Sequence, residues 1–165
     1  MRKAVFFLLS GFTLLSCTQK VFIVRHAEKQ VPGDGSMVMS KTDPPLTEAG
    51  KERAEALRER LKGEKVRTGY TTNYIRTIST LMPTANYFAL DTFHYAKVDE
   101  AFLQRVRMSK GNVLVVGHSN TVDDIVNGLT GKNEVRELSD STYNHLYIVK
   151  LKGKTAKYKL EFYGK

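Results

Sequence analysis

Two short apolar runs, each followed at once by a histidine, dominate the hydrophobic pattern of this chain. Val21–Val24 is β-branched and aromatic, and it stops at Arg25-His26. Val113–Val116 has the same character, and it stops at Gly117-His118. Short apolar runs of this kind, bounded by polar residues, are typical of buried strands. The pattern therefore predicts two strands that each place a histidine just beyond the carboxyl end.

The rest of the pattern alternates between strands and helices. Apolar residues recur at helical spacing over Glu48–Lys62 after an N-cap at Thr47, and over Ile75–Ala89, Asp99–Met108 and Thr121–Leu129. Further strands are predicted at Val66–Thr72 and Thr92–Tyr95, followed by a hairpin of Tyr143–Leu151 and Ala156–Tyr163. Alternation of this kind predicts an α/β fold, a three-layer α/β/α sandwich with a mostly parallel central sheet.

The first residues have the pattern of an export signal. Arg2 and Lys3 precede the apolar stretch Ala4–Leu15, which is too short to span a bilayer. The stretch ends in Leu14-Leu15-Ser16-Cys17, which resembles the lipobox of bacterial lipoproteins. That resemblance implies cleavage before Cys17 and acylation of its thiol and new amino terminus.

These features divide the chain into a signal peptide (1–16), a lipid-anchored tether (17–20) and one domain (21–165). A plain secretory signal, or an uncleaved anchor with an incidental Cys17, is the alternative. Thr18 stands where some lipoproteins carry an aspartate that retains them in the inner membrane, which favours the outer membrane. We therefore expect an exported protein whose membrane contact is the lipidated cysteine.

The composition narrows the choice of partners. The net charge is +9 over 165 residues, which first suggests nucleic acid or an anionic membrane. No block of basic residues is interleaved with aromatic residues on one element, so we expect no nucleic-acid partner. A preference for anionic surfaces or phosphorylated substrates fits the charge better. Cys17 is the only cysteine, so a disulfide framework is excluded.

A third segment, Thr71–Thr80, runs from a weak strand into a helix that Arg76 opens. Ligands of open α/β sheets bind beyond the carboxyl ends of the strands, so we expect Arg76 to join Arg25 and the two histidines there. Guanidinium groups match phosphate oxygens with paired hydrogen bonds. A histidine among them can act as a nucleophile and form a covalent phospho-intermediate. The spacing of metal-binding motifs is absent, so we expect neither a metal nor a cofactor.

Four segments, in this order along the chain, resemble the histidine phosphatase superfamily, whose relatives include the phosphoglycerate mutases and the small phosphohistidine phosphatases. They are Arg25–Glu28 (an RHG or RHA signature), Asp43–Gly50 (an LT-x-x-G helix start), Thr72–Thr77 (the second arginine) and Gly117–Asn120 (the second histidine). The resemblance implies a phosphoglycerate mutase-like fold with His26 as the phosphorylated nucleophile. It also implies a phosphate-binding set of Arg25, His26, Arg76, His118 and Ser119.

The family also uses an acid that protonates the leaving oxygen, and this chain offers no clear counterpart. Glu100 follows Arg76 at about the family's distance, but it also fits the first turn of a helix. Glu28, just after the nucleophile, and Asp124, on the helix after His118, are the alternatives. A good leaving group such as phosphohistidine needs less help from an acid, so the missing counterpart favours a substrate of that kind.

The resulting functional hypothesis is hydrolysis of a phosphomonoester, or of a related phosphoryl group on a small molecule or a protein, through a phosphohistidine at His26. A catalytically silent module that binds phosphorylated ligands, a phosphohistidine phosphatase and a phosphoglycerate mutase-type transferase are the alternatives. The chain lacks insertions that would enclose a sugar bisphosphate, which disfavours the transferase. His94 and His145 lie in strand-like segments and are interpreted as structural.

Overall fold

Strands and helices alternate along the chain up to a C-terminal hairpin. The computed structural model describes residues 18–31 and 42–164. The elements are β1 (Gln19–Arg25), α1 (Glu48–Leu61), β2 (Val66–Thr71), α2 (Ile75–Phe88), β3 (Asp91–His94), α3 (Glu100–Met108), β4 (Asn112–Gly117), α4 (Ser119–Thr130), β5 (His145–Lys152) and β6 (Thr155–Phe162). The predicted signal peptide and Cys17 lie outside the described residues. No helix within the described ranges has the length and apolar character needed to cross a membrane.

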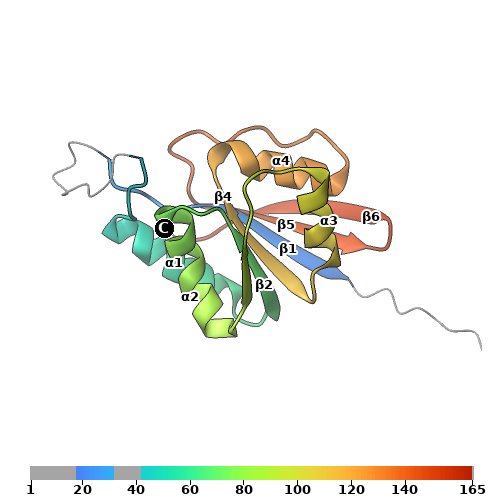
Figure 1. The fold of residues 1–165 in the computed structure, drawn as a ribbon, viewed down its shortest axis with the longest axis horizontal. Helices are drawn as coiled ribbons and strands as arrows, with labels where there is room; N and C mark the ends of the chain where they lie inside the picture. The colour runs from blue at the N-terminus through green and yellow to red at the C-terminus, as the bar shows by residue number, and fades with distance from the viewer. Residues whose placement is uncertain (1–17, 32–41, 165) are drawn as a thin grey trace, which may run out of the picture.

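One six-stranded sheet, in the order β3-β2-β4-β1-β5-β6, forms the centre of the molecule (Figure 1). Strands β1 to β4 pair in parallel, whereas β5 pairs antiparallel with both β1 and β6. The predicted three-layer α/β fold is confirmed, and the mixed sheet combines the parallel strands with the predicted hairpin. Strand β1 lies between β4 and β5, so the first strand of the domain is an interior strand.

Helices cover both faces of the sheet. Successive residues of a strand point to opposite faces of the sheet, and β1 packs against helices on both faces. Val21 and Ile23 pack with residues of α3 and α4, whereas Phe22 and Val24 pack with residues of α1 and α2. All four side chains are fully buried. Burial on both faces explains why the apolar runs of the central strands are continuous rather than alternating.

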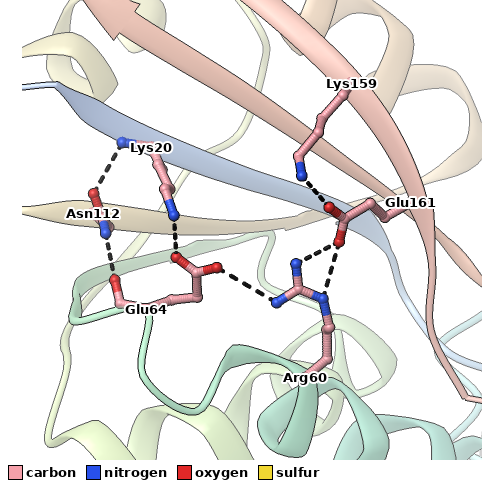
Figure 2. Close-up of polar contacts among 6 residues, drawn as sticks. All are labelled: Lys20, Arg60, Glu64, Asn112, Lys159 and Glu161. Carbon is pink, nitrogen blue, oxygen red and sulfur yellow. Dashed lines mark hydrogen bonds and ion pairs between the residues drawn. The ribbon is translucent and has the colours of Figure 1, made fainter.

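A polar network fixes the end of the sheet at which β1 begins (Figure 2). Lys20 Nζ lies 2.5 Å from a carboxylate oxygen of Glu64, and the backbone N–H of Lys20 donates to Asn112 Oδ1 at 2.9 Å. The side-chain amide of Asn112 donates in turn to the backbone carbonyl of Glu64. Arg60 pairs with both Glu64 and Glu161. The network joins the end of α1 to β1, β4 and β6.

Candidate active site

The carboxyl ends of the parallel strands meet at one edge of the sheet and open into one cavity. His26 directly follows β1, Thr72 follows β2, and His118 follows β4. The backbone N–H of His26 donates to the carbonyl of Gly117 at 2.9 Å, and the two imidazole centroids are 5.4 Å apart. The cavity has a volume of about 820 Å³, and its lining includes Arg25, His26, Lys29, Thr72, Tyr74, Arg76, His94, His118, Ser119 and Asp140.

His26 is buried and held in one tautomer. Its Nδ1 lies 2.8 Å from the carbonyl oxygen of Ala27, which can only accept a hydrogen bond, so Nδ1 carries the proton. The lone pair is therefore on Nε2. Burial, together with the neighbouring charges of Arg25, His118 and Arg76, lowers the pKa of His26 to about 3, although the Ala27 hydrogen bond acts to raise it. The imidazole is neutral at pH 7 and available as a nucleophile.

The backbone that follows β1 is fixed by α1 and α2. Ala27 N–H donates to Thr80 Oγ1 at 2.9 Å, and Thr47 N–H donates to the carbonyl of Glu28 at 2.9 Å. Thr47 also caps α1, since its Oγ1 accepts from Gly50 N–H at 3.0 Å. A Cβ on Gly50 would lie 2.2 Å from the carbonyl oxygen of Glu28. Thr47 and Gly50 of the LT-x-x-G segment thus have different structural roles: Thr47 caps α1, and Gly50 allows α1 to approach the backbone of Glu28. Both residues position the chain beside His26.

Arg25 is anchored by the segment that precedes β5. One terminal nitrogen of its guanidinium donates to the carbonyl of Ser139 at 2.8 Å, and the other lies 3.6 Å from a carboxylate oxygen of Asp140. The guanidinium carbon lies 4.5 Å from the centre of the Tyr143 ring, within the range of a cation–π contact. The arginine is only 4% exposed, so it can stabilise an anion in the cavity with little screening by solvent.

Arg76 has a matching arrangement on α2. Its guanidinium carbon lies 4.3 Å from the centre of the Tyr74 ring, and one terminal nitrogen lies 3.2 Å from Asp43. Both carboxylate oxygens of Asp43 also accept from the backbone N–H of Ile75 at 3.0 Å. Asp43 therefore holds the start of α2 and the arginine together.

Each arginine retains an unused donor. The Nε atoms of Arg25 and Arg76 are buried, and neither has a hydrogen-bond partner among the described residues. A buried charged donor without a partner is costly, and both guanidinium groups line the cavity, where an anion would offset their charge. The two residues therefore fit an anionic ligand.

His118 caps α4 and faces His26 across the cavity. Its backbone N–H donates to Thr121 Oγ1 at 2.8 Å, and its Nε2 lies 2.9 Å from Thr72 Oγ1. Burial and the positive charge of Arg76 together lower the pKa of His118 to about 4. Ser119 is the first residue of α4 and also lines the cavity. The unpaired N–H groups of a helix N-terminus favour an anion at this position.

The profile of the histidine phosphatase superfamily (branch 1) matches residues 21–105, a segment that holds Arg25, His26 and Arg76. This chain belongs to the histidine phosphatase superfamily. His118 lies beyond the matched segment, and the fold brings it to the same cavity. No curated protein sequence matches the chain.

Solved structures of histidine phosphatases have the same fold. The putative phosphohistidine phosphatase SixA of Nakamurella multipartitia is 19% identical with a TM-score of 0.65, over 90% of this chain and 96% of that one. The protein histidine phosphatase SixA complexed with tungstate is 18% identical with a TM-score of 0.66, over 87% and 97%. A putative α-ribazole-5′-phosphate phosphatase of Escherichia coli K-12 is 15% identical with a TM-score of 0.64, over 89% and 96%. At these identities the likeness establishes the fold.

The structure does not bring the three candidate acids into the cavity of this histidine phosphatase. Glu28 is bound by Arg53, whose Nε donates to both of its carboxylate oxygens at 2.8 and 2.9 Å. Glu100 is an exposed residue in the first turn of α3, and Asp124 is exposed on α4; neither lines the cavity. In the described ranges, no group of three or more histidine, cysteine, aspartate or glutamate side chains is placed to hold a metal ion.

Three residues that the sequence did not assign to the site line the cavity or lie against one of its arginines. Tyr143, interpreted from the sequence as a packing residue of the hairpin, lies against Arg25. His94, interpreted as structural, is exposed at the carboxyl end of β3 and lines the cavity. The rule that ligands bind beyond strand ends applies to β3 as it does to β1, so that rule could have found His94. Asp140 lies in an irregular segment, where no sequence signal would have identified it.

Proposed function

We propose that this histidine phosphatase transfers a phosphoryl group from its substrate to His26 and then to water. The observation that carries the proposal is the state of His26: it is neutral, and its Nδ1 proton is held by the Ala27 carbonyl. In the first step the Nε2–P bond forms, and the bond from phosphorus to the leaving atom breaks. In the second step water attacks phosphorus, the Nε2–P bond breaks, and inorganic phosphate is released.

The arginines supply the charge that these steps need. The guanidinium groups of Arg25 and Arg76 line the cavity and would bind the phosphoryl oxygens. His118 and the N-terminus of α4 at Ser119 face the same space. A bound dianion would raise the pKa of His118 and favour its protonated form, which binds the anion more tightly. Because protein groups supply this stabilisation, we expect turnover to survive dialysis against EDTA.

The residues that line the cavity favour a substrate whose leaving group departs without strong acid catalysis. None of Glu28, Glu100 and Asp124 lines the cavity, whereas Asp140 and His94 do. Asp140 is fully exposed to solvent and already pairs with Arg25. We therefore favour phosphohistidine over an alkyl phosphate as the substrate class, in line with the names of two of the structural neighbours. An aryl phosphate has a good leaving group as well and serves as a convenient probe.

The decisive experiment is a phosphoryl panel on the purified protein. It compares phosphohistidine peptide, phosphoramidate, an aryl phosphate and an alkyl phosphate, with His26→Ala as the inactive control. We expect rapid turnover of the first three, slow turnover of the alkyl ester and an acid-labile phosphate trapped on the wild-type protein only. Turnover that survives in His26→Ala would overturn the mechanism. Tight phosphate binding without any turnover would instead favour the catalytically silent binding module.

The cellular location is a separate proposal. We infer from Leu14-Leu15-Ser16-Cys17 that the mature protein begins at a lipidated Cys17 and is exported. Only residues 18–20 separate Cys17 from the predicted domain, a tether of about 10 Å at full extension. Labelling with a radioactive fatty acid in cells tests this, with Cys17→Ser as control. Absence of label on the wild-type chain would remove the lipid anchor.

A further inference from the structure

The edge of the sheet opposite the cavity is rich in basic residues. The parallel strands begin at this edge, and the turn between β5 and β6 returns to it, because Gln19 pairs with Leu151 (Figure 1). The connections into β2 and β4 lie here as well. The exposed cations on these connections and strand ends are Lys62, Lys65, Arg67, Arg107, Lys110, Lys152 and Lys154.

Most of this charge is not neutralised within the protein. Glu64, the acid next to Lys65, is already paired with Lys20 and Arg60 (Figure 2). Of the exposed cations, Lys62 pairs with Glu59. The remaining ones form no ion pair within residues 18–31 and 42–164: Lys65, Arg67, Arg107, Lys110, Lys152 and Lys154. An anion from outside the protein would therefore meet several unpaired positive charges on one edge.

A hollow at this edge brings three of the cations beside the start of the domain. Its volume is about 530 Å³, and its lining includes Lys65, Arg67 and Arg107 together with Thr18 and Gln19. Thr18 directly follows the predicted lipidation site, so the cations surround the point at which the anchor would join the domain. The predicted tether, about 10 Å at full extension, would keep this edge close to the membrane surface.

An apolar side chain projects beside the same cations. Met108 ends α3 between Arg107 and Lys110, and it is 75% exposed, the highest value among the exposed large hydrophobic residues. An exposed apolar residue flanked by cations suits the boundary between lipid headgroups and acyl chains, where the cations bind phosphate and the apolar group enters the hydrocarbon.

We propose that this edge docks on an anionic phospholipid surface. In the hollow, Lys65, Arg67 and Arg107 would bind headgroup phosphates, and Met108 would insert beside them. Docking in this way orients the molecule. The edge at which the parallel strands begin faces the membrane, and the cavity with His26 opens away from it. The proposal is independent of the phosphatase chemistry and adds an electrostatic contact to the predicted lipid anchor.

The test distinguishes membrane binding through the basic edge from membrane binding through the predicted lipid anchor. Among the residues that the structure describes, the buried hydrophobic ones all lie between Val21 and Tyr163, so the chain beginning at Thr18 keeps them and lacks the apolar leader. Its partitioning is measured by co-sedimentation with vesicles of phosphatidylcholine alone and of phosphatidylcholine mixed with phosphatidylglycerol. We expect binding only to the anionic vesicles, and release as ionic strength rises. The double variant Lys65→Gln/Arg67→Gln should bind about 25-fold more weakly, about fivefold for each cation removed.

A matched variant controls for net charge. Lys51→Gln/Lys97→Gln removes the same number of positive charges from exposed positions near the opposite edge, and we expect it to bind like the wild type. Circular dichroism and aryl phosphate turnover confirm that each variant is folded. Equal binding to neutral and anionic vesicles, or equal loss in the two double variants, would refute docking through this edge.

Discussion

Arg53 Nε donates to both carboxylate oxygens of Glu28, at 2.8 and 2.9 Å, and this pair ties the chain beside the nucleophile to α1. Both side chains are largely buried, at 13% and 23% exposed. Arg53→Ala would leave the carboxylate partly buried without its partner. We expect a loss of about 2 kcal/mol in the free energy of unfolding, together with a lower kcat. Urea denaturation and steady-state kinetics measure the two effects.

The exposed pair of Lys51 and Glu48 on the same helix is the control for that variant. Lys51→Ala should cost less than about 1 kcal/mol, because exposed ion pairs contribute little. If Arg53→Ala were no more destabilising than Lys51→Ala, the positioning role of the Glu28–Arg53 pair would be wrong.

Gly50 allows α1 to approach the backbone of Glu28. A Cβ at this position would lie 2.2 Å from the Glu28 carbonyl oxygen, so Gly50→Ala forces the two segments apart. We expect a destabilisation of about 1–3 kcal/mol and a fall in kcat larger than any change in KM, because His26 would be displaced. The neighbouring exposed residue gives a control, Ala49→Ser, which should change stability by less than about 0.5 kcal/mol. A fully stable, fully active Gly50→Ala enzyme would contradict this account.

The guanidiniums of Arg25 and Arg76 should not be replaceable by lysine. A lysine keeps the charge but loses the Nε donor and the planar contact with a tyrosine ring. We expect Arg25→Lys and Arg76→Lys each to lower kcat/KM by roughly 10²–10³ and to weaken inhibition by inorganic phosphate. Arg136→Lys, at an exposed position outside the cavity, is the control. Wild-type phosphate inhibition in both arginine variants would argue against their role in binding the anion.

Stability should fall as the solution becomes acidic. The pKa of His26 is about 3 in the folded chain and 6.5 as its ordinary value, so between these values the unfolded chain binds the proton and the folded chain does not. The stabilising effect is complete above pH 6.5 and declines below it. When the pH is lowered from about 7.5 to 5, the protonation of His26 in the unfolded chain should by itself reduce the free energy of unfolding by roughly 2 kcal/mol.

Urea denaturation across this pH range measures the decline. The variant His26→Gln has no such titration, so its stability should decrease less steeply over the same interval, with the remaining slope contributed in part by His118. Parallel stability curves for the two proteins would mean that folding does not lower the pKa of His26.

The hydrophobic pattern predicted the elements that carry the site, because β1 and β4 are buried on both faces and leave an unbroken apolar run in the sequence. The strand-end rule then placed His26 and His118 at one edge. The pattern could not assign Glu28, since its partner Arg53 meets it only through the packing of α1 on the sheet. It also missed Tyr143, because this residue lies in an irregular segment whose contact with Arg25 depends on tertiary structure. Local sequence signals thus located the strand ends, whereas the residues that hold the arginines could be identified only from the tertiary structure.

The interior place of β1 has a consequence for the order in which the enzyme becomes active. Its two neighbours, β4 and β5, come much later in the chain, so β1 cannot pair before β4 has been synthesised and gains its second partner only with β5. Pairing over such sequence distances is a late event in folding. His26 is synthesised before the strands that flank β1, and the segment that anchors Arg25 joins the site only with β5. The nucleophile therefore precedes its pocket along the chain, and we expect its activity to appear only after both strands have paired.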